Sequence, residues 1–336
     1  MNAPGVGIIG CGLIGGKRAA VLGAARLVAC ADPVMDRAQA LAKRHPGCQA
    51  YSDPGELIKH PDVSVVIIAT PNNLLAPLTR QAIESGKHVL VEKPAALNSE
   101  ELAPLIPLAA ANRVQVRVGF NHRYHPSFRK ARELLNQNAL GPLMFLRARY
   151  GHGGRVGYDR EWRADPKLSG GGELIDQGIH LIDLSRWLLG ELELYSGFAA
   201  TYFWDMPVDD NAFMMLKGRD QRMAFLHVSC TEWKNLFSLE LYGKTGKLHI
   251  EGLGGSYGVE RINYYRMLPE MGPPETTTWE FPRGDDSWAV EWAEFMDDIQ
   301  LGREPSAGLP DALAALGVVR DVYERRAPEL APRRTP

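Results

Sequence analysis

Residues 6–16, VGIIGCGLIGG, place three glycines with GxGxxG spacing directly after a short apolar run. A helix-like segment follows, and Asp32 ends the next apolar run about 20 positions further on. The GxGxxG motif alone is weak evidence for a binding site, since glycine is common in loops. Its position after a strand-like run and before a helix-like segment, however, is typical of a dinucleotide-binding turn. The stretch therefore predicts an α/β domain with a parallel sheet.

Each glycine has a physical role in such a turn. Gly10 allows the tight turn, Gly12 lets a pyrophosphate approach the backbone, and Gly15 lets the helix pack closely on the strand. Asp32 would accept hydrogen bonds from the adenosine ribose and repel a 2′-phosphate, which favours NAD over NADP. The alternative is a tight turn in an α/β domain that binds no cofactor.

The composition excludes several classes of protein. Lys and Arg total 38 against 40 for Asp and Glu, so nothing favours nucleic acid or an anionic membrane as a partner. The four cysteines form no CxxC pair, so we expect neither a metal site nor a disulfide framework, and a reducing cytoplasm fits. The N-terminus has no basic leader, and no apolar run reaches the ~18 residues of a membrane span.

The first part of the chain, residues 1–122, alternates strand-like and helix-like segments, as in a doubly wound Rossmann domain. The expected strands are 6–10, 26–32, 63–70, 87–93 and 114–120, and the expected helices are 34–44, 73–86 and 99–111. Several strands are apolar at consecutive positions, which indicates that helices cover both faces of the sheet.

The pattern changes in residues 123–336, which we predict to form an α+β domain with a large, open, mostly antiparallel sheet. Residues 236–243, LFSLELYG, alternate between two sets of side chains that would point to opposite faces of a strand. Expected helices are 126–138, 170–190, 287–302 and 309–326, and the last of these can pack back on the first domain. The strand-like segment 222–230, RMAFLHVSC, has apolar residues at both odd and even positions, so both of its faces are apolar. We therefore expect a second subunit to cover one face in a homodimer or homotetramer.

Two segments carry groups suited to proton transfer. EKP, residues 92–94, places Lys93 at a strand end before a proline, whose peptide bond can be cis. GGGELIDQGIHLIDLSRWLLG, residues 170–190, reads as one helix with Asp176, His180 and Asp183 on a single polar stripe. The alternatives are a solvated lysine and a core histidine neutralised by a neighbouring aspartate.

In this order and spacing, GxGxxG, ATPNN, GKHVLVEKP and GGGELIDQGIHLID resemble the GFO/IDH/MocA family of NAD(P)-dependent sugar and polyol oxidoreductases. The resemblance implies a Rossmann domain followed by an open-sheet domain. It also implies that Lys93, Asp176 and His180 form the catalytic group. One departure is Leu75, which stands where many members have histidine.

The expected contacts follow from these segments and from the Gly-rich basic loop before residue 170. Cofactor contacts are expected at Gly10, Gly12, Leu13, Ile14, Gly15, Asp32, Thr70, Pro71, Asn73, Glu92, Lys93 and Asn121. Substrate contacts are expected at Lys93, Arg123, Tyr158, Trp162, Arg163, Asp176 and His180. The arginines and aromatics favour a sugar nucleotide or other anionic sugar, unless the loop's own acidic residues pair with its arginines.

The expected activity is hydride transfer between a sugar hydroxyl and NAD, in a site that closes between the two domains. The sequence of this loop most resembles those of family members that act in surface-polysaccharide and sugar-nucleotide biosynthesis. Three alternatives stay open: an inositol or free-sugar dehydrogenase, an NAD-dependent glycosidase that oxidises its sugar transiently, and a non-catalytic protein that binds NAD and sugar.

Overall fold

The computed structural model describes residues 4–325, and these residues form two compact units. The first unit contains residues 4–121 and 286–314, and the second contains 122–285 and 315–325. The segment 286–314, which the sequence placed in the second domain, thus belongs to the first unit. The predicted domain ends 1–3 and 326–336, with the last residue of helix 309–326, lie outside the described residues.

The first unit is a six-stranded parallel sheet with strand order β3-β2-β1-β4-β5-β6. The strands are β1 (Gly5–Ile9), β2 (Arg26–Ala31), β3 (Gln49–Tyr51), β4 (Val65–Ile68), β5 (His88–Val91) and β6 (Val116–Val118). The helices are α1 (Leu13–Ala19), α2 (Met35–Ala42), α3 (Pro54–Lys59), α4 (Asn72–Glu84), α5 (Ser99–Leu102), α6 (Leu105–Asn112) and α10 (Ser287–Leu301). The predicted doubly wound Rossmann fold is confirmed.

Two local predictions for this unit were incomplete. The sequence did not indicate β3 and α3, which are only 3 and 6 residues long. The single helix expected at 99–111 is two helices, because Pro104 lies between them and cannot continue the hydrogen-bond ladder of α5.

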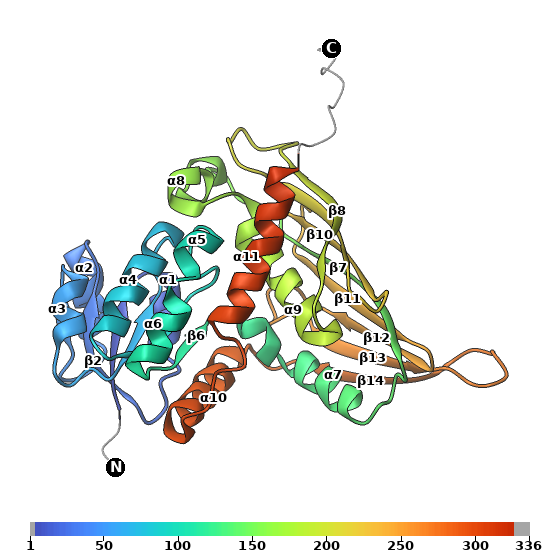
Figure 1. Cartoon of the computed structure of the whole chain (residues 1–336), viewed down its shortest axis with the longest axis horizontal. Coiled ribbons are helices and arrows are strands. Elements are labelled where there is room, and N and C mark those ends of the chain that lie inside the picture. Colours follow the sequence, from blue (N-terminus) through green and yellow to red (C-terminus); the bar gives the residue numbers. More distant parts are fainter. Residues whose placement is uncertain (1–3, 326–336) are drawn as a thin grey trace. The chain divides into compact units, whose positions relative to one another are not determined.

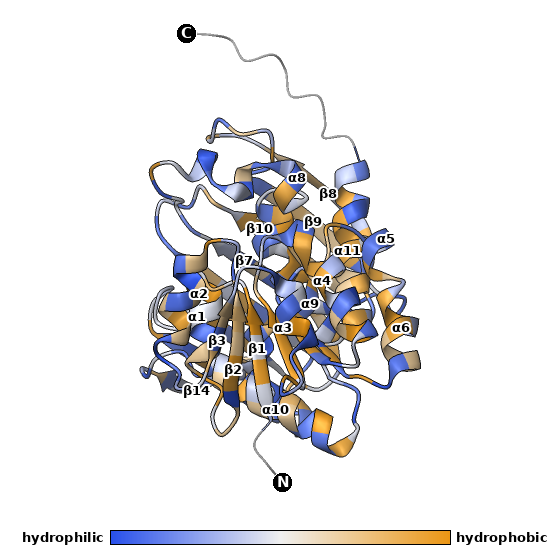
Figure 2. Ribbon diagram, turned by 90° about the vertical axis from the view of Figure 1, so that its left-hand side faces the viewer, coloured by the Kyte–Doolittle hydropathy of each residue, from blue (hydrophilic) through white to orange (hydrophobic). Residues whose placement is uncertain are grey.

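The core of the first unit lies around its central strands. Val6, Ile8 and Ile67 are fully buried, and β1 and β2 are apolar along most of their length in Figure 2. Trp292 and Phe295 of α10 belong to the same core. Helix α10 is therefore an integral part of this unit, although it is far away in the sequence.

A buried ion cluster joins three parts of the first unit. Arg18 of α1 is fully buried, and its guanidinium contacts Glu92 at 2.6 Å and Glu291 of α10 at 2.5 Å. Burial lowers the pKa of Arg18, but attraction to Glu291 and Glu92 outweighs it, so the pKa lies above its ordinary value. The cluster ties the helix after the glycine loop to the segment that carries EKP.

The second unit is built on an eight-stranded sheet with order β14-β13-β12-β11-β7-β10-β9-β8. Only β7 and β10 pair in parallel, so the predicted mostly antiparallel sheet is confirmed. The strands are β7 (Leu143–Gly151), β8 (Glu193–Ala200), β9 (Asn211–Lys217), β10 (Met223–Ser229), β11 (Leu236–Gly243), β12 (Gly246–Glu251), β13 (Glu260–Arg266) and β14 (Glu275–Phe281). Helices α7 (Pro126–Asn136) and α9 (Ile179–Leu189) cover one face (Figure 1). Helix α11 (Leu309–Glu324) begins in the first unit and ends in the second.

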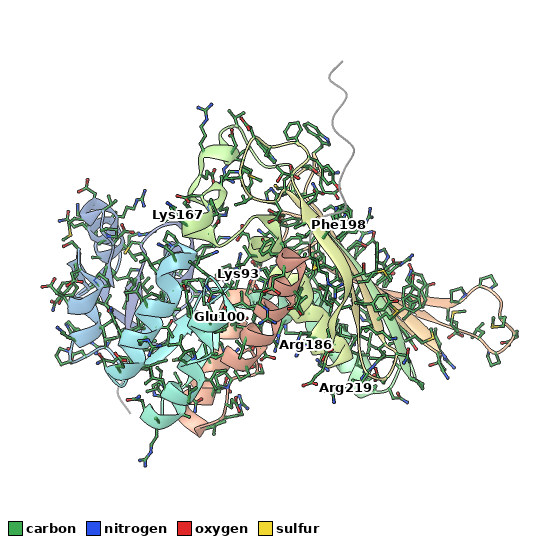
Figure 3. The ribbon with its side chains drawn as sticks, turned by 45° about the horizontal axis from the view of Figure 1, so that its top comes forward. Lys93, Glu100, Lys167, Arg186, Phe198 and Arg219 are labelled. Atoms are coloured by element: carbon green, nitrogen blue, oxygen red, sulfur yellow. The ribbon has the colours of Figure 1, made fainter. Side chains whose placement is uncertain are left out.

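The other face of this sheet carries apolar side chains. In β10, Ala224 and Leu226 are buried whereas Phe225 is exposed. Phe198 of β8, labelled in Figure 3, lies beside Phe213 of β9, with ring centroids 5.3 Å apart. Apolar residues thus lie on both faces of these strands, as expected.

The helix predicted at 170–190 begins three residues later, at Glu173, and its first turn is π-helical. A short helix, α8 (Pro166–Ser169), ends at Gly170, and a π-helical turn, η4 (Leu174–Gly178), precedes α9. The Asp209 carboxylate accepts hydrogen bonds from the backbone N–H groups of Gly172 and Leu174, at 2.9 and 2.8 Å. This side chain from a distant segment holds the chain at the start of η4, which helix periodicity cannot indicate.

Three cysteines that are separate in the sequence lie close together in the first unit. The Sγ atoms of Cys30 and Cys48 are 3.8 Å apart, and the Cys11 thiol donates to the Ala31 carbonyl at 3.5 Å. All four cysteines of the chain are free thiols within the described structure. Among the helices of residues 4–325, none has both the length and the apolar character needed to cross a membrane.

Neighbouring glycines of α1 give a matched test of this packing. A Cβ on Gly15 would lie 1.9 Å from the Gly10 carbonyl oxygen, whereas a Cβ on Gly16 meets only Arg44 at 3.9 Å. We expect Gly15→Ala to lower the free energy of unfolding by about 1–3 kcal/mol through overpacking. Gly16→Ala should raise it by about 0.5–1 kcal/mol, because alanine favours helix. Equal effects in chemical denaturation would contradict the packing role of Gly15.

Candidate active site

The expected cofactor residues of the first unit share one edge of its sheet. The glycine loop follows β1, Asp32 follows β2, and the segments starting at Thr70, Glu92 and Asn121 follow β4, β5 and β6 closely. Because all these strands are parallel, their carboxyl ends meet at the same edge. The strand order reverses between β1 and β4, which is where open parallel sheets bind ligands.

The glycine loop has the geometry of a cradle for a ligand. Gly10 has a φ of 92°, and a Cβ there would lie 2.4 Å from the Ala69 carbonyl oxygen. At Gly12, by contrast, a Cβ would meet no atom within 4 Å. Leu13, the first residue of α1, is 77% exposed, and Ile14 is half-buried. The backbone at Gly12 is therefore open to a bound group that a side chain would obstruct.

Asp32 supports the loop in addition to its expected role. Its Oδ2 accepts a hydrogen bond from the backbone N–H of Cys11 at 2.9 Å, and its Oδ1 accepts one from Val34 at 2.9 Å. Each carboxylate oxygen retains a second lone pair for a ribose hydroxyl. The side chain that would select the ribose thus also fixes the loop that would hold the pyrophosphate.

Two other cofactor candidates, Glu92 and Asn121, have hydrogen-bond partners within the first unit. Glu92 pairs with Arg18, and the Asn121 amide donates to the Ser287 Oγ at 2.9 Å. These two side chains therefore support the sheet edge from within the first unit.

Lys93 follows β5 directly (labelled in Figure 3) and is half-buried, and its bond to Pro94 is cis. Thr70 and Pro71 lead into α4 and are half-buried. The buried Oδ1 of Asn73 has no hydrogen-bond partner among the described residues. Leu75 is fully buried in α4 and supplies packing instead of a polar group.

His180 of α9 lies in a cluster of aromatic rings in the second unit. Its side chain is buried, and its ring stacks on that of His122 with centroids 3.8 Å apart and an interplanar angle of 21°. Tyr150 of β7 lies edge-on to both imidazoles. Burial raises the pKa of Tyr150, as does its hydrogen bond to Tyr257. The plane of the His180 ring is thus set by its neighbours.

Asp176 lies on η4 and pairs with an arginine of the preceding loop. Arg163 donates from Nε to the Asp176 Oδ2 at 2.9 Å, and its Nη1 lies 3.7 Å from Glu161. Burial lowers the pKa of Arg163, but Asp176 raises it by more. The guanidinium also stacks over Trp162, 4.6 Å from the ring centroid. Arg163 therefore contacts two other expected substrate residues, Trp162 and Asp176, and carboxylates of its own unit neutralise it.

A second buried carboxylate lies three residues before Asp176. Glu173 is fully enclosed, with the His152 Nε2 at 3.5 Å and the Tyr158 hydroxyl donating to it at 3.4 Å. Burial raises the pKa of Glu173. For His152 burial lowers the pKa, but the hydrogen bond and attraction to Glu173 raise it by more, so the net shift is upward. Tyr158 is thus buried against the same π-helical turn that carries Asp176.

Arg123 has a structural partner. Its guanidinium is buried and forms two hydrogen bonds with Asp183, the Nε bond being 2.8 Å long. Trp187, on the same helix as Asp183, packs under Arg132 at 4.0 Å. Asp183 and Trp187 therefore support the fold, and Arg123, an expected substrate contact, lies in a buried ion pair with Asp183.

His152 is the member of this cluster that the sequence did not single out. It follows β7, so its position at a strand end is the signal that could have marked it. Within residues 4–325, no group of three or more His, Cys, Asp or Glu side chains is arranged to hold a metal ion.

Both halves of the chain match one family. Residues 5–120 match "Oxidoreductase family, NAD-binding Rossmann fold", and residues 128–249 match "GFO/IDH/MocA C-terminal domain". The chain belongs to the GFO/IDH/MocA family. Its first unit is accordingly the NAD-binding Rossmann domain of that family.

Individual relatives agree with this assignment. Inositol 2-dehydrogenase 4 of Saccharopolyspora erythraea is 34% identical over 191 residues, which is 55% of this chain and about half (54%) of that protein. The scyllo-inositol 2-dehydrogenase (NAD(+)) of Bacillus subtilis is 27% identical over 88% of this chain and 84% of its own length. A solved levoglucosan dehydrogenase in complex with NADH superposes with a TM-score of 0.85 at 21% identity, covering 95% of this chain and 97% of that chain. The last comparison concerns the fold alone.

The raised pKa of His152 predicts a pH-dependent contribution to stability. Protonated His152 is held by Glu173, so its contribution is complete below pH 6.5 and is lost as the pH rises through the raised pKa. Replacing it by glutamine should therefore lower the unfolding temperature more at about pH 6 than at about pH 9.

The matched control is His249→Gln. Burial lowers the pKa of His249, so protonation at acid pH opposes folding and its replacement should show the reverse trend. Parallel pH dependences for the two variants, measured by thermal unfolding, would refute the His152–Glu173 interaction.

Proposed function

We propose that the protein is an NAD-dependent dehydrogenase that oxidises a hydroxyl of an uncharged sugar or polyol. The observation that carries the proposal is the His180 cluster: a buried imidazole stacked on His122, one turn from the Asp176–Arg163 pair. Family membership supports the reaction class, and the names of the inositol and levoglucosan dehydrogenases support a polyhydroxylated substrate.

The glycine loop supports NAD as the cofactor. The open backbone at Gly12 would receive the pyrophosphate, and Asp32 would accept hydrogen bonds from the adenosine ribose and repel a 2′-phosphate. When bound, NAD supplies the acceptor for the hydride that leaves the substrate carbon. Gly10, Leu13, Ile14 and Gly15 would line the same loop, and Thr70, Pro71 and Asn73 belong to the same sheet edge.

In the proposed mechanism His180 removes the hydroxyl proton. Stacking on His122 holds the imidazole plane, so the ring nitrogen need not reorient before it accepts the proton. Asp176 would orient a neighbouring hydroxyl, since Arg163 fixes the direction of its carboxylate. Lys93 enters the proposal through the family resemblance alone, as a hydrogen-bond donor that would stabilise negative charge developing on a substrate oxygen.

Charge pairing in the second unit favours an uncharged substrate. The expectation of a sugar nucleotide depended on arginines near residue 170. Arg123 pairs with Asp183, Arg155 with Glu161, and Arg163 with Asp176. A phosphate would have to displace the carboxylates at these three arginines, so they give less support to an anionic sugar or polysaccharide precursor.

Alanine variants of Lys93 and His180 test the proposal. Lys93→Ala and His180→Ala should each lower the rate of NADH formation at least about 100-fold, while NAD binding stays close to normal. Exposed Lys43→Ala is the control and should keep full activity.

A screen of wild-type protein with inositols, free sugars and sugar nucleotides identifies the substrate. Net NADH accumulation separates a dehydrogenase from a glycosidase, which regenerates its cofactor, and from a protein that only binds NAD. Wild-type turnover in either alanine variant would remove that residue from the mechanism.

We infer that the chain assembles as a homodimer or homotetramer through the open face of its large sheet. Phe198, Phe213 and exposed Phe225 share that face, and a large exposed apolar patch is a usual feature of a subunit interface. Light scattering should give at least a dimer. Phe225→Lys should reduce the assembly because it places a charge in the interface, whereas Arg26→Glu at an exposed position of the first unit should not. A monomeric wild type would contradict the inference.

A further inference from the structure

A row of aromatic rings runs through the second unit from a fully solvated position to a buried one. Trp233, Phe203, Trp204 and Tyr158, here called the aromatic ladder, are neighbours in that order. The centroid distances are 5.2 Å from Trp233 to Phe203, 5.2 Å from Phe203 to Trp204, and 5.6 Å from Trp204 to Tyr158. Trp233 is 79% exposed and Phe203 is 54% exposed, whereas Tyr158 is buried. Exposed aromatic rings that form a contiguous patch are a usual mark of a binding surface.

The exposed end of the ladder is rigidly built. Asp210 is fully buried, and its carboxylate accepts backbone hydrogen bonds from Tyr202, Phe203 and Trp204 at 2.7–3.0 Å. The indole N–H of Trp204 donates to the Cys230 carbonyl at 2.9 Å. A charged anchor of this kind holds the turn in one conformation, so the rings of Phe203 and Trp204 are presented in a fixed arrangement.

The turn that carries Trp233 is also constrained. Trp233 has a φ of 56°, a left-handed conformation that side-chain-bearing residues rarely adopt. Its backbone packs on Gly153, where a Cβ would lie 3.1 Å from the Trp233 Cα. A Cβ on Gly154 would lie 2.3 Å from the Trp204 indole. Glycine at both positions lets the two tryptophans pack directly on this loop.

The buried end of the ladder meets the candidate active site. The Tyr158 hydroxyl donates to Glu173, which lies three residues before Asp176 at the start of the same π-helical turn. His152, the other partner of Glu173, lies 5.5 Å from the Tyr158 ring. The buried end of the ladder therefore reaches the start of the turn that carries Asp176, and all of these residues belong to the second unit.

Charges beside the ladder do not suit a phosphate. Arg155 stacks over Tyr158 at 5.6 Å but is paired with Glu161 at 2.5 Å. Besides the buried Asp209 and Asp210, the turns that carry the exposed rings contain the carboxylates of Asp205 and Glu232 and the cation of Lys234. Since this set has no excess of positive charge, the ladder favours an uncharged ring over a nucleotide.

We propose that the aromatic ladder is a subsite for a second, uncharged sugar ring, so that the substrate is a disaccharide or other glycoside. The inference rests on the proposed dehydrogenase function and specifies its substrate class. The apolar C–H face of a pyranose stacks on an aromatic face and buries both from water. The ring being oxidised would lie at Asp176 and His180, and the second ring would lie on Phe203 and Trp233.

Kinetics with paired substrates test this subsite. Wild type, Phe203→Ala and Trp233→Ala are assayed for NADH formation with a free monosaccharide and with disaccharides that contain it, and UDP-sugars form a third arm. Tyr195→Ala, which removes an exposed aromatic ring outside the ladder, is the control. We expect each ladder variant to raise KM for the disaccharide about tenfold, with kcat unchanged, the monosaccharide unaffected and Tyr195→Ala silent.

Three results would overturn the proposal. These are equal effects on monosaccharide and disaccharide, a preference of wild type for the UDP-sugar that the ladder variants abolish, and a change of oligomeric state by light scattering with no change in KM. Calorimetric titration of the disaccharide into the NAD-loaded protein separates this inference from the proposed function. Weaker binding to the ladder variants supports the subsite even if no sugar is oxidised, and equal binding to all four proteins refutes it.

Discussion

Arg18 is fully buried, and a charge removed from water must be paired or the fold does not form. Its two partners come from segments that are otherwise unrelated, Glu92 at the end of β5 and Glu291 on α10. The requirement to neutralise one guanidinium therefore fixes the helix after the glycine loop, the strand end that carries Lys93, and a helix from near the end of the chain. The sheet edge proposed to bind NAD is held in place by this one cluster.

The second unit also depends on buried charges that need partners, but there the charges are negative. Asp209 and Asp210 are buried carboxylates whose charge is satisfied mainly by backbone N–H groups. Asp209 holds the chain that enters η4, and Asp210 holds the turn that presents Phe203 and Trp204. Two adjacent acidic residues thus position both the catalytic candidate Asp176 and the exposed end of the aromatic ladder. Neither carboxylate needs to touch a substrate to have these effects.

Much of the fold and part of the site could be predicted from the sequence because their signals are local. Gly10, Gly12 and Gly15 act within one turn, and Lys93 and His180 lie in short motifs. The roles of the arginines could not be predicted, because a guanidinium binds a substrate anion and a protein carboxylate with the same geometry. Arg123 finds Asp183 across 60 residues and Arg163 finds Asp176 across 13, so only the folded chain distinguishes the two uses.

The sequence by itself determined most of the strands and helices, though not the short β3 and α3, since hydrophobic periodicity and glycine spacing depend on neighbours a few residues apart. It also determined the family and the candidates for its chemistry. Only the tertiary structure decided how the helix in residues 170–190 begins, because Asp209, whose carboxylate accepts the N–H groups at its start, lies 35 residues beyond Leu174. Likewise, only the fold aligned Trp233, Phe203, Trp204 and Tyr158, since no periodicity links side chains on three separate loops.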